Sequence, residues 1–305
     1  MTDSLAGLST EQSDPRYREI DRLSTEQVAR LMNTADATVP AAVAEAIPAI
    51  STAIDAIVGR MKRGGRLIYV GAGTSGRLAV LDASECPPTF GTDPELVQGV
   101  IAGGEPALTR SVEGAEDDAP AGAAAMEERE VGALDSVVGV SASGRAPFVV
   151  GALREAARRG ALTVALTCNA GAPIAAAARH PIEVVVGAEV VTGSTRLKAG
   201  TAQKLVLNMI STIAMVGLGR TYGNNMIEVS AANAKLADRA TRMVSDITGA
   251  GLSAARSALE EAGWNVKVAV LMVEQGLDSE GARTLLTAHG DNLEAALAAE
   301  GVRGG

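Results

Sequence analysis

Two groups of carboxylates offer the most distinctive chemistry in the sequence. Glu85 stands before Cys86 and the consecutive prolines Pro87 and Pro88, and such a pair predicts a stiff, non-helical turn. A carboxyl group that is held rigidly and partly buried suits a general acid, because burial raises its pKa. Residues 113–118 contain four further carboxylates, and the pattern does not single out a general base among them. A solvated acidic turn is the alternative explanation for both groups.

Three segments rich in glycine and hydroxyl residues each lead into a predicted helix. They are residues 71–76 (GAGTSG), 141–145 (SASGR) and 192–196 (TGSTR). Hydroxyl and backbone N–H groups at a helix N-terminus can hold a phosphate, and ligands of open parallel sheets bind beyond the carboxyl ends of the strands. Helix capping explains any one segment, whereas the three together predict a site for a phosphate monoester on a small molecule. The candidate binding residues are Gly73, Thr74, Ser75, Ser141, Ser143, Ser194, Thr195 and Lys198.

Lys198 belongs to a small basic group with Arg196 and Lys204 in an otherwise acidic chain. We expect this group to attract an anionic ligand. A Schiff base between Lys198 and an open-chain aldehyde is a chemical alternative, but nothing in the sequence indicates a depressed pKa for this lysine. The electrostatic role is therefore preferred.

The first glycine-rich segment also matches the Gly-x-Gly-x-x-Gly pattern of dinucleotide-binding domains. That interpretation requires an acidic residue at the end of the second strand, where it holds a ribose. Asp93 and Glu95 lie near the required distance but precede the next apolar run instead of ending it. A dinucleotide site is therefore the weaker interpretation of these glycines.

The composition excludes several classes of protein. The 305 residues carry a net charge of −9 and only 2% are aromatic, which argues against a nucleic-acid partner. The two cysteines and two histidines form no cluster, so no metal site is expected. The polar N-terminus does not resemble a signal peptide, and no continuous apolar run reaches the roughly 20 residues that span a bilayer. We therefore expect a cytoplasmic protein without membrane contact.

Hydrophobic periodicity predicts an α/β fold. Two helices precede the first strand, and the first is capped by Ser24 and Gln27 and ends near Met32. The second covers Val39–Met61, and its Pro48 predicts a kink or a break into two helices. Short apolar runs then alternate with helical stretches, which predicts a parallel sheet with helices on both faces. The predicted strands are Leu67–Val70, Leu96–Ala102, Val137–Ser141, Leu162–Thr167 and Ile182–Val186.

The C-terminal part is predicted to be entirely helical. We divide the chain into an N-terminal arm with helices (residues 1–62), the α/β domain (63–240) and a small helical domain (241–305). Gly290–Leu297 resembles the end of a three-helix module of the ubiquitin-associated type. The helices predicted within and after the sheet are Phe148–Arg159, Lys198–Leu218, Ser253–Ala262, Val266–Gln275, Glu280–Ala288 and Asn292–Ala299.

Two of the hydroxyl-rich segments resemble the sugar isomerase (SIS) phosphosugar-binding domain. The resemblance rests on Gly73-Thr74-Ser75 after the first strand and on Ser141-x-Ser143-Gly144 after a later one. It implies a five-stranded parallel sheet flanked by helices, a flavodoxin-like sandwich. It also implies a dimer, because domains of this family commonly dimerise and place their sites near the subunit interface.

Three longer segments, residues 82–91, 112–117 and 192–204, resemble the N-acetylmuramic acid 6-phosphate etherases, and the similarity covers nearly the whole chain. The resemblance implies a lyase of cell-wall amino-sugar recycling. Its substrate would be N-acetylmuramic acid 6-phosphate, and its products N-acetylglucosamine 6-phosphate and D-lactate. A phosphosugar isomerase and a non-catalytic phosphosugar sensor, as in the related glucokinase regulatory protein, are the rival interpretations.

The same resemblance implies roles for the carboxylates. Glu85 would be the general acid and Glu116 the general base, with Glu113 and Asp117 as alternatives for the base. The C2 proton is acidic next to the aldehyde of the open-chain sugar, the departing lactate needs a proton, and water then adds across the double bond. We therefore expect no metal and no cofactor. One departure is Ala146, which stands where a hydroxyl residue is expected in the second phosphate-binding segment.

Overall fold

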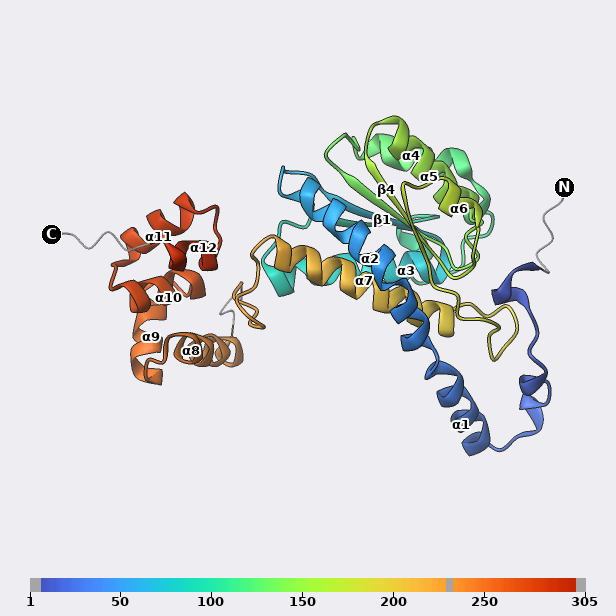
Figure 1. Ribbon diagram of the computed structural model, residues 1–305, viewed down its shortest axis with the longest axis horizontal. Coiled ribbons are helices and arrows are strands. Elements are labelled where there is room, and N and C mark those ends of the chain that lie inside the picture. Colours follow the sequence, from blue (N-terminus) through green and yellow to red (C-terminus); the bar gives the residue numbers. More distant parts are fainter. Residues whose placement is uncertain (1–6, 229–232, 300–305) are drawn as a thin grey trace. The chain divides into compact units, whose positions relative to one another are not determined.

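The computed structural model describes two stretches of the chain, residues 7–228 and 233–299 (Figure 1). The predicted domain boundaries after residues 62 and 240 stay predictions. The parts of those domains at residues 1–6, 229–232 and 300–305 lie outside the described residues.

The described residues form two compact units. The first runs to Ser84 and resumes over Pro94–Ala214. The second comprises Glu85–Asp93 and the residues from Met215 onward. The first unit contains the sheet and most of the length of its covering helices. The second contains the last residues of two of those helices together with the C-terminal helices.

A five-stranded sheet in the order β2-β1-β3-β4-β5, with every strand pair parallel, confirms the predicted α/β fold. Strand β5 begins earlier than predicted and includes Pro181. Proline is tolerated there because β5 is an edge strand that pairs with β4 alone. The strands are β1 Leu67–Gly71, β2 Val97–Ile101, β3 Ser136–Val140, β4 Leu162–Thr167 and β5 His180–Glu183.

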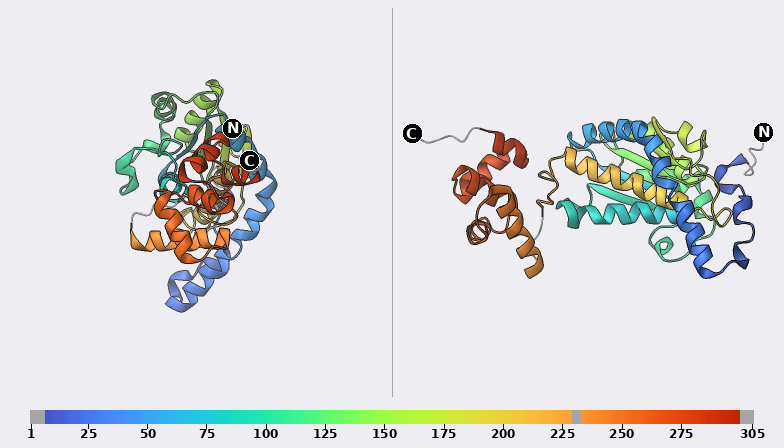
Figure 2. Two further views of the ribbon diagram at one scale, coloured as in Figure 1. Left: turned by 90° about the vertical axis from the view of Figure 1, so that its left-hand side faces the viewer. Right: turned by 60° about the horizontal axis from the view of Figure 1, so that its bottom comes forward.

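Helices cover both faces of the sheet (Figures 1 and 2). One face carries α2 Val39–Met61, α3 Gly73–Phe90 and α7 Lys198–Gly217. The other face carries α4 Ala119–Glu128, α5 Pro147–Arg158 and the short α6 Pro173–Ala176. Because both faces are covered, the residues of β1, β3 and β4 are buried throughout, as in other parallel sheets.

Helix α2 has the predicted bounds and follows α1 Thr25–Asp36, whose Ser24–Gln27 capping box is also confirmed. Of the two outcomes predicted at Pro48, the break into two helices is wrong, because α2 is one helix through it, and the kink stays a prediction. Pro48 lies on the exposed side, where water can satisfy the carbonyl group that loses its N–H partner.

The helical stretch Thr25–Met61 is long and apolar enough to cross a membrane by length and composition alone. Core helices of soluble proteins can have the same length and apolar composition. Part of the apolar surface of α2 forms a buried stripe that includes Val43, Ile50 and Ile57, and α2 packs on β4 and β5. This packing accounts for the buried stripe, whereas Ile47 is exposed.

The predicted non-helical turn at Pro87 and Pro88 is wrong, because α3 continues through both prolines to Phe90. The φ angle of proline matches the helix, but each proline lacks an N–H group and so leaves one carbonyl group of the preceding turn without its helical partner. The helix then ends where the N–H of Gly91 donates to the Pro87 carbonyl (2.9 Å). Glu85 therefore lies on a regular helix and not on a rigid turn.

The four predicted C-terminal helices are confirmed, and one further helix precedes them. The side chains of Asn265, Asp278 and Asn292 each accept a backbone N–H and so cap three of these helices. Their apolar faces meet in one buried cluster that includes Leu259, Val270 and Leu286. The helices are α8 Ala234–Thr248, α9 Leu252–Glu261, α10 Val266–Gln275, α11 Ser279–Ala288 and α12 Leu293–Ala298.

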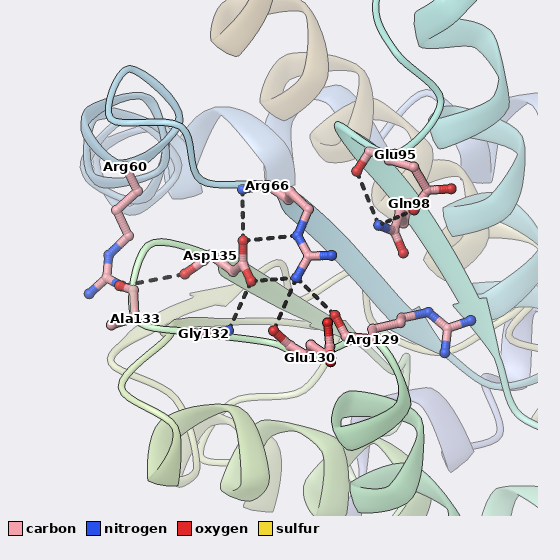
Figure 3. A network of polar contacts seen from close by, with 9 residues as sticks. All are labelled: Arg60, Arg66, Glu95, Gln98, Arg129, Glu130, Gly132, Ala133 and Asp135. Atoms are coloured by element: carbon pink, nitrogen blue, oxygen red, sulfur yellow. Dashed lines mark hydrogen bonds and ion pairs between the residues drawn. The ribbon is translucent and has the colours of Figure 1, made fainter.

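A partly buried ion pair joins the starts of β1 and β3 (Figure 3). The carboxylate of Asp135 accepts from the backbone N–H of Arg66 (2.9 Å), from Nε (3.2 Å) and Nη2 (2.8 Å) of its guanidinium, and from the N–H of Gly132 (2.9 Å). Burial alone would raise the pKa of Asp135, but these hydrogen bonds outweigh it and hold the pKa below its ordinary value. The two strands are thereby fixed at the edge opposite the hydroxyl-rich segments.

Replacement of Asp135 by asparagine should destabilise the α/β unit. The change removes the charge that Arg66 faces, and we expect a loss of about 2 kcal/mol in the free energy of unfolding. Because the folded pKa is lowered, the contribution is present above pH 3.8, the ordinary pKa of aspartate, and disappears as the pH falls below it. Urea unfolding followed by circular dichroism at pH 7 and near pH 3 would measure both effects. A variant as stable as wild type at pH 7 would contradict the expectation.

Candidate functional site

The first hydroxyl-rich segment forms a tight turn between β1 and α3. A Cβ atom on Gly71 would lie 2.7 Å from the Gly76 nitrogen, and Gly73 has a φ of +53°. Gly71 is therefore required by the close approach of the backbone, and Gly73 by its left-handed conformation. The hydroxyl of Ser75, a buried residue, donates to Oε1 of Gln203 on α7 (2.9 Å).

The second segment follows β3 and presents two hydroxyl groups. The Oγ of Ser141 accepts the N–H of Gly144 (3.0 Å), and the Oγ of Ser143 accepts the N–H of Arg145 (3.3 Å). Because both oxygens act as acceptors, their protons can be donated to an anion. Gly144 has a φ of +69°, and a Cβ there would meet Ala172 at 2.3 Å.

These two segments share one cavity of about 300 Å³. Most of its walls are polar, and it opens at the carboxyl ends of the strands, as predicted. A second cavity of about 290 Å³ adjoins it. Glu116 lines both cavities, as do Ala72 and Gly73. The lining of the first cavity is Glu11, Ala72, Gly73, Thr74, Ser75, Glu116, Val140, Ser141, Ala142, Ser143, Ala146 and Thr195.

Glu116 is the predicted base that lies in the same cavity as the first two hydroxyl-rich segments. It lies on the 3₁₀ turn Ala115–Asp117. Partial removal of water by the cavity walls, and to a smaller extent the charge of Asp117, raises the pKa of its carboxyl group. Glu113 and Asp117 line the adjoining cavity but not the first one. The geometry therefore favours Glu116 among the acidic residues of this segment.

The third hydroxyl-rich segment contributes less than expected. Thr195 lines the first cavity, whereas Ser194 and Lys198 do not. The N-terminus of α7 is already occupied, because the buried carboxylate of Glu189 accepts the N–H groups of Lys198 (3.0 Å) and Ala199 (2.9 Å). A phosphate cannot use these donors, so the predicted helix N-terminal site is closed here.

Lys198 itself lines a separate cavity of about 570 Å³ with Tyr17 and Leu31. Its Nζ donates to the carbonyl oxygen of Val186 (2.6 Å). Burial lowers the pKa of the amine, and the charge of Glu189 partly opposes this effect. Lys198 is therefore apart from the cavity that holds Glu116.

Glu85 does not line the cavities that Glu116 lines. It is an exposed residue on α3, twelve positions after Gly73. At 1.5 Å per residue, the helix carries it about 18 Å along its axis from the first loop. Within one chain, the loops and Glu116 therefore lie at the start of α3. The predicted acid lies much farther along the same helix.

Two residues of the site were not predicted from the sequence. Glu11 lines the first cavity from the N-terminal 3₁₀ turn Ser9–Glu11, and no local pattern marks it. Gln203 supports Ser75. The sequence does mark Gln203, because it is a polar residue among mostly apolar buried residues of α7 such as Ala202 and Val206. Among the described residues, no group of three His, Cys, Asp or Glu side chains lies close enough together to hold a metal ion.

Comparison with known proteins gives a consistent family assignment. Residues 49–157 match the glucokinase regulatory protein N-terminal SIS domain, and residues 119–213 match the SIS domain. Proteins named N-acetylmuramic acid 6-phosphate etherase from Streptomyces avermitilis and Streptomyces coelicolor are each 56% identical over 295 residues, which cover 97% of this chain and 95% of theirs. One from Rubrobacter xylanophilus is 54% identical, covering 94% of this chain and 96% of its own.

The fold has a counterpart among solved structures. A phosphoheptose isomerase from Francisella tularensis aligns with 64% of this chain and 100% of its own, with a TM-score of 0.52 and 19% identity. At that identity the likeness concerns the arrangement of the sheet and helices alone.

Restoring a hydroxyl group at position 146 should improve anion binding. Ala146 lines the cavity and is the N-cap of α5 without a side-chain cap. We expect Ala146→Ser to stabilise the protein by about 1 kcal/mol through capping and to tighten the binding of inorganic phosphate severalfold. Thermal unfolding and calorimetric titration with phosphate would measure the two effects.

Gly251→Ser is a matched control for this variant. Gly251 is the N-cap of α9, also without a side-chain cap, and it does not line the cavity. It should change stability without changing the affinity for phosphate. Equal phosphate affinity in Ala146→Ser and wild type would show that position 146 plays no part in binding.

Proposed function

The chain belongs to the N-acetylmuramic acid 6-phosphate etherase family, and from that premise we propose how its residues perform the reaction. It is a lyase of cell-wall amino-sugar recycling. The reaction cleaves the D-lactyl ether of N-acetylmuramic acid 6-phosphate and gives N-acetylglucosamine 6-phosphate and D-lactate. The placement of Glu116 beside the hydroxyl-rich loops is the observation that carries the assignment of roles.

The first two loops bind the phosphate group. Ser141 and Ser143 donate their hydroxyl protons, and Thr74 and Thr195 extend the polar wall around them. Charge-assisted hydrogen bonds of this kind are stronger than neutral ones. The sugar chain begins beside the phosphate in the first cavity and extends past Glu116 toward the adjoining cavity.

Glu116 removes the C2 proton of the open-chain sugar. The aldehyde at C1 makes this proton acidic, and the electron pair left at C2 expels the ether oxygen at C3. A base with a raised pKa is a better proton acceptor than an ordinary carboxylate, provided that it is ionised at the working pH. Water then adds across the C2–C3 double bond, and the C2 carbon regains a proton.

We propose that the departing lactate oxygen takes its proton from Glu85 of a second copy of the chain. Glu85 is about 18 Å along α3 from the loops of its own chain, so a homodimer that pairs α3 helices would present it to the other copy. Leu81 on α3 and Ile213 on α7 are exposed apolar residues, and Lys204 and Asp82 tie these two helices together (2.7 Å). This apolar face supports association between copies.

The surroundings of the reaction follow from charge and composition. A chain with a net charge of −9 and 2% aromatic residues offers little to nucleic acid. We place the enzyme in the cytoplasm, where it works without membrane contact, metal or cofactor. The acid–base steps above need only carboxyl groups and water.

The pH dependence of the reaction tests the role of Glu116. Because Glu116 must be ionised, kcat/KM should fall as the pH decreases through its raised pKa, above the ordinary value of 4.5. Asp117→Asn removes a negative charge that contributes to the shift, so the acid limb should move to lower pH. Asp118→Asn is the control, since Asp118 caps α4 through Ala121. Loss of C2 exchange with solvent deuterium in Asp117→Asn would identify Asp117 as the base instead.

Mixed dimers test the origin of the acid. Glu116→Gln should lose lactate release and C2 exchange, whereas Glu85→Gln should lose lactate release and keep exchange. A dimer with one copy of each variant has one intact site if Glu85 acts across the interface, so lactate release should return to about half of wild type. If Glu85 acts within its own subunit, both sites carry a lesion and the mixed dimer stays inactive. Measured lactate from separately tagged, co-purified subunits decides between them.

A further inference from the structure

The N-terminal arm enters the substrate cavity. We propose that Glu11, carried by this arm, binds the hydroxyl and amide N–H groups of the sugar, and that Thr10 and Asn169 position it. The inference rests on the proposed function for the identity of the sugar. It adds a specificity residue that recognises the carbohydrate part of the ligand and not its phosphate.

A buried hydrogen-bond network fixes the arm in place. Asn169 is 2% exposed and Thr10 is 0% exposed. The Oδ1 of Asn169 accepts from the Ser9 hydroxyl (2.9 Å) and from the Thr10 backbone N–H (3.4 Å). Its Nδ2 donates to the Thr10 hydroxyl oxygen (2.9 Å). Buried polar groups that are paired in this way are costly to separate, so the arm is held firmly.

The same network ties the arm to the phosphate-binding loop. The Nδ2 of Asn169 also donates to the carbonyl oxygen of Ala142 (3.0 Å), which lies between Ser141 and Ser143. The arm and this loop are therefore positioned by one side chain. Glu11, the next residue after Thr10, is brought to the cavity wall as a consequence.

The carboxylate of Glu11 lies against the third hydroxyl-rich segment. A Cβ atom built on Gly193 would be 3.1 Å from Oε2 of Glu11. Gly193 has a φ of +74°, so the absence of a side chain there leaves room for the carboxylate. Glu11 thus occupies a defined place beside Thr195, which lines the same cavity.

Charge decides which part of the ligand Glu11 can face. A carboxylate repels both the phosphate and the lactyl carboxylate of the substrate. It accepts hydrogen bonds at several lone pairs, and such charge-assisted bonds are strong. The donors that the substrate offers are the hydroxyl groups of the sugar chain and the N–H of its acetamido group. Glu11 therefore selects an amino-sugar phosphate over a bare phosphate ion.

Binding measurements with two ligands test this assignment. Calorimetric titration of Glu11→Ala should show about 10- to 100-fold weaker binding of N-acetylglucosamine 6-phosphate, with inorganic phosphate bound no more weakly than by wild type. Glu19→Ala is the control. It removes a carboxylate from the same arm that forms only an exposed pair with Arg22, and it should bind both ligands as wild type does.

Variants of Thr10 test the positioning role independently. Thr10→Val keeps the shape of the side chain but removes the oxygen that Asn169 uses. It should weaken sugar phosphate binding while phosphate binding stays near wild type, and Thr10→Ser should restore it. A thermal unfolding measurement of each variant confirms that the protein is folded before the affinities are compared.

Two outcomes would overturn the inference. Unchanged affinity of Glu11→Ala for N-acetylglucosamine 6-phosphate would show that Glu11 does not contact the sugar. An equal loss for both ligands would show that the arm supports the phosphate loop and not recognition of the sugar. Lactate release by the wild-type enzyme reports on the proposed function separately, because a protein that binds amino-sugar phosphates through Glu11 without releasing lactate would retain this inference and lose the enzymatic one.

Discussion

The hydrogen-bonded ion pair between Asp135 and Arg66 joins the residues directly before β1 and β3, and so aligns the starts of the two strands. Both strands have five residues and run in register from Leu67 opposite Ser136 to Gly71 opposite Val140. Their loops therefore emerge level with each other at the far edge of the sheet. The proposed phosphate site requires that alignment, because hydroxyl groups from both loops would have to reach one anion. The cavity thus depends on an interaction at the opposite edge of the sheet.

Local sequence patterns predict the sheet and the turns formed by the first two hydroxyl-rich segments, which follow β1 and β3. Strands, glycine turns and helix caps are encoded within a few residues, and β1, β3 and their loops lie where periodicity and turn chemistry place them. Glu11 could not be predicted in this way, since it is placed by Asn169, a contact across about 160 positions. The role of Glu189 was not predicted either, because no local pattern shows that this side chain bonds to the first N–H groups of α7. Its carboxylate accepts N–H groups at the N-terminus of α7, where the sequence predicts a bound phosphate.

The prolines after Glu85 show how a residue pattern can mislead. Two consecutive prolines usually end a helix, but α3 continues through both and ends two residues after the second, at Phe90. Glu85 lies on this helix and not on the rigid turn that the prolines predict. Glu85 lies twelve positions after Gly73 in the sequence, and the helical rise places it about 18 Å along α3 from the first loop. Proximity along the chain and proximity in space differ most in an element of this kind.

Helix α3 has its first turn in the phosphate loop and Glu85 in its fourth. In the proposed homodimer this single element belongs to two sites, one at each end. A displacement of the helix when a ligand binds at its first turn is then transmitted to the acid that serves the other site. Under thermodynamic linkage such coupling is reciprocal. The two subunits would therefore be expected to respond to substrate cooperatively, with the helix as the mechanical connection between them.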